Sequence, residues 1–203
     1  MPTIRETAGK MPLYVEEDFT ASLREKLCQG VLDAAVIASP FTANDVVVKE
    51  LYKEAFVVLM PADHPLAQKA AIKHDDLIDE AILLLGEGHC LRDQVLAACP
   101  AIQRSLDANN ATSKMIAEGS SLETIKYMVA SGLGITLLPA SAAAFSEQES
   151  VSGGTVVRPF SAPAPTRTIA LAWRASFPRH QAIDLVVAAI RQSSDVLKLE
   201  NIA

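Results

Sequence analysis

Cys90 stands where the sequence pattern changes from a strand to a helix. An apolar run from Ala81 to Leu85 predicts a buried strand, and Gly86 and Gly88 break it. After Cys90 the apolar residues return at helical spacing. Unpaired backbone N–H groups and the helix dipole favour an anion at such a helix start. We therefore expect a thiol there to lose its proton readily and to act as a nucleophile or a redox group.

A second cysteine, Cys99, follows Cys90 after nine positions. In an α-helix this spacing corresponds to about 900° of rotation and ~13.5 Å of rise, so the two sulfurs face opposite sides. A disulfide needs Cα atoms within about 7 Å of each other. Two interpretations stay open. Either Cys99 is a small buried residue and Cys90 is incidental, or the pair is a redox switch whose thiols join once the helix unwinds.

Composition narrows the class of protein. The chain has 203 residues, 50% of them hydrophobic, which is enough for one domain or two small lobes. Its net charge of −6 does not favour nucleic-acid binding, and three cysteines without a framework spacing fit a reducing compartment. The sequence shows no membrane-spanning apolar window, signal-peptide core, zinc-like spacing or glycine-rich phosphate loop. We expect a cytoplasmic protein without a metal or other cofactor.

Strand and helix patterns alternate along the chain. A helix is predicted from Thr20, as its N-cap, to Gly30, and Cys28 inside it is expected to be buried and inert. A capping box at Ser120 and Glu123 predicts another helix. The other expected elements are a helix end over 1–12, strands over 13–15, 32–38, 46–48, 55–60, 135–138 and 168–173, and helices over 140–145 and 181–199. This alternation is typical of an α/β fold with parallel βαβ units.

One motif resembles a known family. Gly88-His89-Cys90-Leu91-Arg92-Asp93-Gln94, with Cys99 behind it, is similar to the signature of the hydrogen-peroxide-sensing OxyR branch of the LysR-type transcriptional regulators. The resemblance runs from about Pro2 to about Arg174. It implies a two-lobed effector-binding fold like that of periplasmic binding proteins, each lobe a mixed, mostly parallel sheet flanked by helices. Lobe I would be residues 1–53 and 169–203, and lobe II residues 54–168, with Cys90 near the cleft.

The resemblance also implies roles for individual residues. Cys90 would be the peroxidatic thiol that becomes a sulfenic acid, and Cys99 the resolving thiol that joins it in a disulfide. His89 would be a donor near the thiolate, Arg167 an arginine that activates the cysteine, and Thr20 a threonine that contacts the peroxide. The ordinary alternatives are a turn histidine, a surface arginine at a strand start and a helix N-cap.

Partners follow from the same resemblance. They are hydrogen peroxide, a second copy of the chain in a homodimer (a tetramer in the full-length protein), and a thiol reductant such as a glutaredoxin or thioredoxin. DNA would be bound through an N-terminal winged helix-turn-helix outside this sequence. The first strand of lobe I is also expected to be missing, and extra residues to follow Cys99.

Two other function classes compete with a peroxide-sensing, non-enzymatic regulator. One is a LysR-type effector domain that binds a small metabolite without redox switching. The other is a thiol peroxidase, which would need a reductant for turnover.

Overall fold

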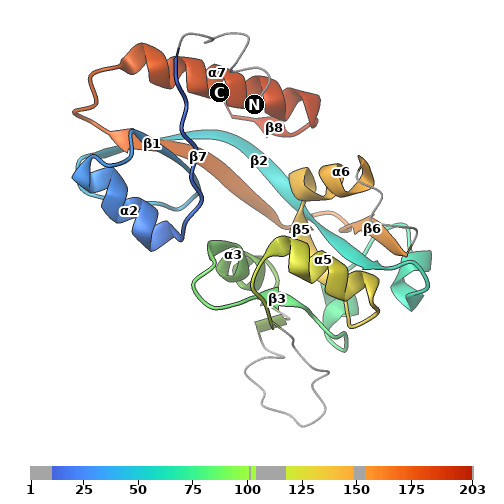
Figure 1. Cartoon of the computed structure of the whole chain (residues 1–203). Helices are drawn as coiled ribbons and strands as arrows, with labels where there is room; N and C mark the ends of the chain where they lie inside the picture. The colour runs from blue at the N-terminus through green and yellow to red at the C-terminus, as the bar shows by residue number, and fades with distance from the viewer. Residues whose placement is uncertain (1–10, 101, 104–117, 149–153, 203) are drawn as a thin grey trace. The chain divides into compact units, whose positions relative to one another are not determined.

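The chain forms two compact units (Figure 1). The structure, a computed structural model, describes residues 11–100, 102–103, 118–148 and 154–202. Unit 1 comprises residues 1–54 and 167–203, and unit 2 residues 55–166. The chain passes between the units twice, within strand β2 (Val46–Pro61) and at the start of strand β7 (Thr166–Arg174). The helix end expected over residues 1–12 lies almost wholly outside the described residues.

Unit 1 is a sheet with a helix against each face (Figure 1). Its elements are α2 (Thr20–Gln29), β1 (Ala34–Ala38), the first part of β2, β7, α7 (His180–Val196) and β8 (Glu200–Asn201). Strand β1 pairs antiparallel with β7, and β8 pairs antiparallel with β2. The short strand expected over 13–15 is wrong, because no strand forms there and Tyr14 and Val15 are exposed.

The alternating direction of side chains along β7 explains why a helix packs on each face of the sheet in unit 1. Successive strand side chains point to opposite faces. Ala170 and Ala172 therefore pack on one face with Leu27 of α2, and Leu171 packs on the other with Ile183 of α7. Helix α2 ends as predicted at Gly30, whose φ of 83° lies in the left-handed region that favours glycine.

Unit 2 contains the cysteine segment. The second part of β2 pairs antiparallel with β5 (Thr136–Pro139) and β6 (Thr155–Pro159), and β3 (Leu84–Leu85) pairs parallel with β4 (Glu118–Gly119). The helices are α3 (Cys90–Ala98), α5 (Leu122–Ala130) and α6 (Ala140–Gln148), with 3-10 turns η1 (Pro65–Gln68) and η2 (His74–Leu77).

The predicted α/β class is confirmed, but the pairing differs from the mostly parallel sheets expected. The pairs β1–β7, β2–β5, β2–β6 and β2–β8 are all antiparallel. The reason is that the two long strands that link the units take neighbours running against them. Parallel pairing occurs between β3 and β4 and at single bridges such as Ile82 with Ile135.

The apolar run before the cysteines serves two cores. Ile82 and Leu84 point to the side of α3, and Leu83 and Leu85 point to the side of α5. The run therefore has no polar face, as a strand covered on both sides requires. Its approach to β5 is tight, because a Cβ on Gly134 would lie 2.4 Å from the Ala81 carbonyl oxygen.

Helix α5 begins one residue later than predicted. Ser121, not Ser120, is the N-cap, and its hydroxyl accepts a hydrogen bond from the Thr124 N–H at 3.1 Å. Ile125 and Val129 face the core, as the pattern indicated.

Candidate functional site

Cys90 is the first residue of α3, and its side chain is exposed. Strand β3 ends at Leu85, and the chain turns through Gly88, whose φ is 89°, to reach His89, the N-cap. The His89 carbonyl accepts the Arg92 N–H at 3.0 Å, which closes the first turn of the helix. The predicted change from strand to helix at Cys90 is confirmed.

Arg92 ties the start of α3 to the β3–β4 pair. Its Nη1 donates to the Leu85 carbonyl at 2.9 Å and to Glu118 Oε1 at 2.6 Å. Beside them, the Gly86 N–H donates to the Gly119 carbonyl at 3.1 Å. The Arg92 side chain is 13% exposed and that of Glu118 is 47% exposed. Arg92 therefore fastens the start of α3 to the two strands, and the Glu118 carboxylate balances its charge.

Cys99 lies at the opposite end of α3, as its C-cap, and is fully buried. It packs in an apolar cluster with Phe56, Val95 and Ile102. Burial raises the pKa of the Cys99 thiol to about 11, because the thiolate would lose its hydration. At neutral pH this sulfur is therefore a protonated, weakly nucleophilic thiol.

The helix between the two cysteines keeps them apart. All three cysteines of the chain are free thiols. Nine helical residues, from Cys90 to Ala98, separate the two ends, and the corresponding rise of ~13.5 Å exceeds the reach of a disulfide. Joining Cys90 to Cys99 requires part of α3 to unwind.

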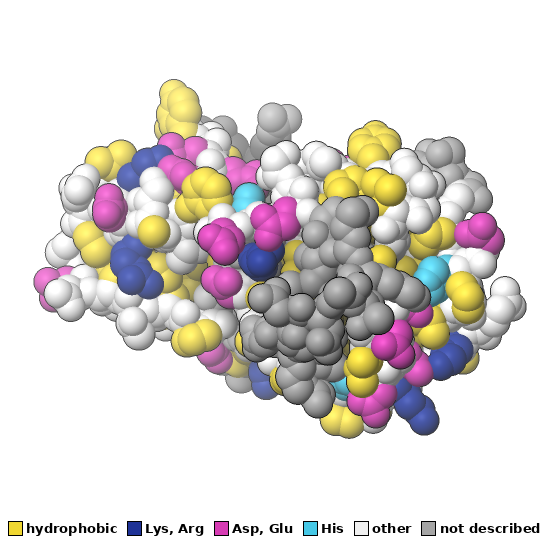
Figure 2. Space-filling model, turned by 90° about the horizontal axis from the view of Figure 1, so that it is seen from below, with side chains coloured by type: hydrophobic (Ala, Val, Ile, Leu, Met, Phe, Trp, Pro, Cys, Tyr) yellow, Lys and Arg dark blue, Asp and Glu magenta, His cyan; other side chains and the backbone are white. Residues whose placement is uncertain are grey.

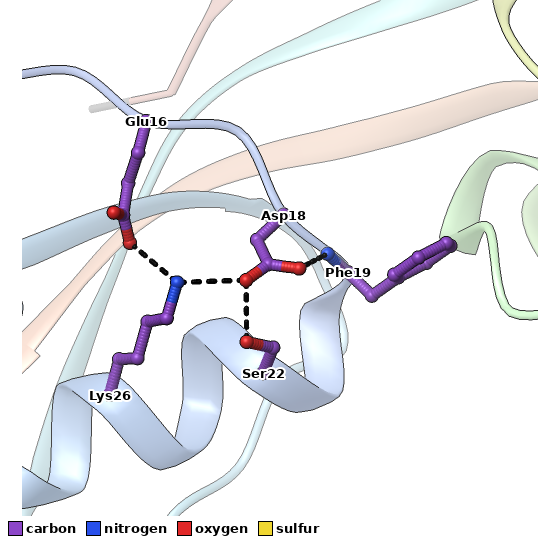
Figure 3. A network of polar contacts seen from close by, with 5 residues as sticks. All are labelled: Glu16, Asp18, Phe19, Ser22 and Lys26. Carbon is purple, nitrogen blue, oxygen red and sulfur yellow. Dashed lines mark hydrogen bonds and ion pairs between the residues drawn. The ribbon is translucent and has the colours of Figure 1, made fainter.

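Thr20 lies in unit 1 as the first residue of α2, so its expected N-cap role is wrong. The N-cap is Phe19, and the carboxylate of Asp18 accepts the Phe19 N–H at 2.8 Å, the Ser22 hydroxyl at 2.6 Å and the Lys26 ammonium at 2.8 Å (Figure 3). These bonds, led by that of Lys26, lower the pKa of Asp18 to about 2. Thr and Asp are both residue types that cap helices well. Here Asp18, and not Thr20, makes the side-chain hydrogen bond at the start of α2.

Arg167 also lies in unit 1, near the start of β7, and is paired with a buried carboxylate. Its Nε and Nη2 lie 2.8 and 2.7 Å from Glu54 Oε1 on β2. The Glu54 side chain is fully buried, and that of Arg167 is 18% exposed. Arg167 is therefore not an ordinary surface arginine. Sequence analysis missed Glu54, although a lone carboxylate beside the apolar run of a strand is a recognisable signal.

The structure therefore brings His89 and Cys90 together at one end of α3 and sets Cys99 at the other. Thr20 and Arg167 belong to the other unit, on α2 and β7. Glu118, which holds Arg92, carries no signal in the sequence because it lies 26 positions from its partner.

The expectation that Cys28 is buried needs correction. Cys28 is exposed, because its neighbour Leu27 takes the inward position of α2 and a helix turns by about 100° per residue. His64 has partners that its sequence context did not suggest. Its Nδ1 accepts the Leu66 N–H at 3.2 Å, and its Nε2 lies 3.3 Å from a Glu80 oxygen.

Three other features were not found among the described residues. In the described ranges no group of three or more His, Cys, Asp or Glu side chains is arranged to hold a metal ion. Within the same part of the chain, no helix combines the length and apolar character needed to cross a membrane. On the face shown in Figure 2, acidic, basic and hydrophobic side chains are interspersed, with no continuous basic patch among the described ones.

Comparison with known proteins assigns the family. Residues 1–195 match the profile described as the LysR substrate binding domain. The chain belongs to this family. A probable hydrogen peroxide-inducible genes activator of Streptomyces viridosporus is 36% identical over 190 residues, which make up 94% of this chain and 58% of that protein.

Solved structures point the same way. Full-length OxyR of Pseudomonas aeruginosa, in a cysteine-to-aspartate variant, is 52% identical with a TM-score of 0.82, over 94% of this chain and 60% of that one. A cysteine-to-serine variant of Corynebacterium glutamicum OxyR with hydrogen peroxide bound is 29% identical, with a TM-score of 0.82, over 97% and 59%. This LysR substrate-binding domain thus spans less than two thirds of the length of these proteins, and the predicted resemblance to OxyR is confirmed.

Proposed function

We propose that this LysR substrate-binding domain is the hydrogen-peroxide-sensing regulatory part of a transcription activator. The observation that carries the proposal is the contrast between the two ends of α3. The thiol at its start is exposed, the thiol at its end is fully buried, and no disulfide joins them. The peroxide-inducible activators and OxyR structures that resemble the chain support it.

The chemistry has two steps. The Cys90 thiolate attacks one oxygen of hydrogen peroxide, the O–O bond breaks, and the products are a Cys90 sulfenic acid and hydroxide. The Cys99 sulfur then attacks the sulfenic sulfur, which forms the Cys90–Cys99 disulfide and releases water. Two electrons pass from the two thiols to one peroxide. A dithiol reductant, such as a glutaredoxin or thioredoxin, returns them by thiol–disulfide exchange.

The second step converts oxidation into a conformational signal. Cys99 must leave the cluster it shares with Phe56, Val95 and Ile102, and part of α3 must unwind. The segment is therefore a two-state element that the disulfide biases. In the full-length protein, which we propose is a homodimer or tetramer, the change would alter subunit contacts and so the DNA-binding region N-terminal to this domain.

Three more residues tune the reaction in this proposal. His89, the N-cap beside Cys90, donates a hydrogen bond near the thiolate and the departing hydroxide. Thr20 and Arg167 have the roles implied by the family resemblance, namely peroxide contact and activation of the cysteine.

Arg167 needs a test that separates activation from folding. Arg167→Gln alone would remove the ion pair that Arg167 makes with the buried Glu54 carboxylate, and breaking a buried pair costs about 3–5 kcal/mol. The double variant Glu54→Gln/Arg167→Gln removes both charges and should recover most of that stability in urea unfolding. If the recovered double variant oxidises as fast as the wild type, Arg167 has no activating role.

The proposal is tested by trapping the sulfenic acid. We expect one equivalent of hydrogen peroxide to oxidise the wild type to a disulfide, and Cys99→Ser to accumulate a Cys90 sulfenic acid that a dione probe captures. Cys90→Ser should capture no probe at any position, and Cys28→Ser is the matched control that should behave as the wild type. Probe capture at Cys28 in place of Cys90 would refute the proposal.

A second function, binding of a small metabolite, follows from the family itself, whose description is a substrate-binding domain. It predicts a rise in the thermal midpoint with a metabolite and no response of Cys90 to peroxide. The sulfenic acid experiment therefore separates the two functions.

A further inference from the structure

Helix α3 is held at its first turn by one arginine. Arg92 is the third residue of the helix, two positions after Cys90, and its Nη1 bonds both the Leu85 carbonyl and Glu118 Oε1. The two bonds fasten the cysteine end of the helix to both strands of the β3–β4 pair. We name Arg92, Glu118 and the Leu85 carbonyl the Arg92 clamp.

The clamp links the two sides of the segment between Cys90 and Cys99, which must rearrange when the disulfide forms. Glu118 lies after both cysteines, so the Arg92–Glu118 bond joins the turn beside Cys90 to the chain beyond Cys99. Helix α3 is also held by apolar packing of Val95 and Cys99 in the core of unit 2. The clamp is polar, and 47% of its Glu118 side chain is exposed to solvent.

We propose that Glu118 is a positioning residue of the redox switch: through Arg92 it holds the first turn of α3 in the thiol state and so slows closure of the Cys90–Cys99 disulfide. This inference rests on the proposed function. Its physical basis is that Arg92 cannot keep both the Leu85 and Glu118 bonds while the turn around it unwinds. At least one of the two bonds therefore breaks before closure, and weakening the Glu118 bond makes the opening easier.

The effect of the negative charge of Glu118 must be distinguished from the effect of its bond to Arg92. Removing any carboxylate near Cys90 also favours the thiolate through longer-range electrostatics. Glu87, three positions before Cys90, is exposed and provides the matched control. Glu87→Gln removes the same charge without touching the clamp. An effect of the clamp is one that Glu118→Gln shows and Glu87→Gln does not.

The first measurement uses no oxidant. Amide hydrogen exchange of the thiol form is compared among the wild type, Glu118→Gln and Glu87→Gln. An exposed ion pair is worth up to about 1 kcal/mol, which corresponds to roughly fivefold. We expect Glu118→Gln to speed exchange in α3 by roughly two- to fivefold, more than it speeds exchange in α5, and to lower the thermal midpoint by at most about 4 °C. Unaltered exchange in α3, or an equal increase in Glu87→Gln, overturns the proposal.

The second measurement follows closure. After one equivalent of peroxide, rapid acid quench and mass spectrometry give the rate at which the Cys90 sulfenic acid becomes the disulfide. Glu118→Gln should close roughly two- to fivefold faster than the wild type, and Glu118→Lys, which sets two cations together, faster still. Adding Arg92→Glu to Glu118→Lys restores an ion pair and should slow closure again. Slower or equal closure in Glu118→Gln overturns the clamp. A wild type that never closes refutes the proposed function, while the exchange experiment still tests the clamp.

Discussion

The two ends of α3 place the same side chain in opposite surroundings. Cys90 is exposed at the start of the helix, among polar contacts that include the Arg92–Glu118 pair. Cys99 is fully buried at the end of the helix, in an apolar cluster that raises its pKa to about 11. In the proposed mechanism this difference sets the order of events: the exposed sulfur reacts with the oxidant first, and the buried sulfur becomes available after the helix opens.

The largest expected difference is in alkylation. A pKa raised from 9.0 to about 11 leaves Cys99 with roughly 100-fold less thiolate at neutral pH than an ordinary cysteine, and burial slows it further. We expect iodoacetamide to label Cys90 at least ~100-fold faster than Cys99 in peptide-resolved mass spectrometry. Exposed Cys28 serves as an internal reference. Similar alkylation rates for Cys90 and Cys99 would show that the two thiols do not differ in reactivity.

The next difference is in the pH dependence of stability. Because the folded-state pKa of Cys99 is raised, its contribution is fully present below about pH 9 and is lost as pH rises towards 11. Two pKa units correspond to about 2–3 kcal/mol. The free energy of unfolding of the wild type, minus that of Cys99→Val, should fall by this amount between pH 9 and 11. A constant difference over that range would contradict the burial argument.

Packing at the buried end gives a smaller effect. Val95→Ala removes two methyl groups from the cluster around Cys99 and should lower the free energy of unfolding by about 1–3 kcal/mol. It should also speed alkylation of Cys99 more than that of Cys90. The control Ala97→Ser, at an exposed position of the same helix, should change stability by less than about 0.5 kcal/mol. Equal effects from both variants would mean that α3 is not held by this core.

The smallest effect belongs to the exposed end. Cys90→Ser should leave the free energy of unfolding within about 0.5 kcal/mol of the wild type, because the side chain already contacts water. Cys99→Ser, which puts a hydroxyl into an apolar cluster, should cost about 1–3 kcal/mol. Urea titrations of both variants measure the two values, and a larger loss at Cys90 would reverse the comparison.

Local sequence patterns predicted those features that are determined by residues close together in the chain. The helix after Cys90, the buried residue Val95 and the end of α2 at Gly30 all follow from periodicity and backbone preference. The resemblance to OxyR came from a seven-residue motif and one spacing. These features need no knowledge of how distant segments meet.

Contacts between distant residues were out of reach. Arg167 and Glu54 are 113 positions apart, so neither residue type announces the other. The exposure of Cys28 depends on which side of α2 meets the sheet, a choice of one residue in the helical period. The antiparallel pairing of β7 with β1 and of β2 with β5 depends on how the long strands find neighbours, which the alternation of strands and helices does not specify.

We propose that oxidation of Cys90 at the exposed end of α3 leads to a disulfide with Cys99 from its buried end. Disulfide mapping by mass spectrometry, after one equivalent of hydrogen peroxide and blocking of the remaining thiols, tests it most directly. We expect one linked peptide pair containing Cys90 and Cys99, with Cys28 alkylated. A Cys90 that is still alkylated, or one that is linked to Cys28, would contradict it.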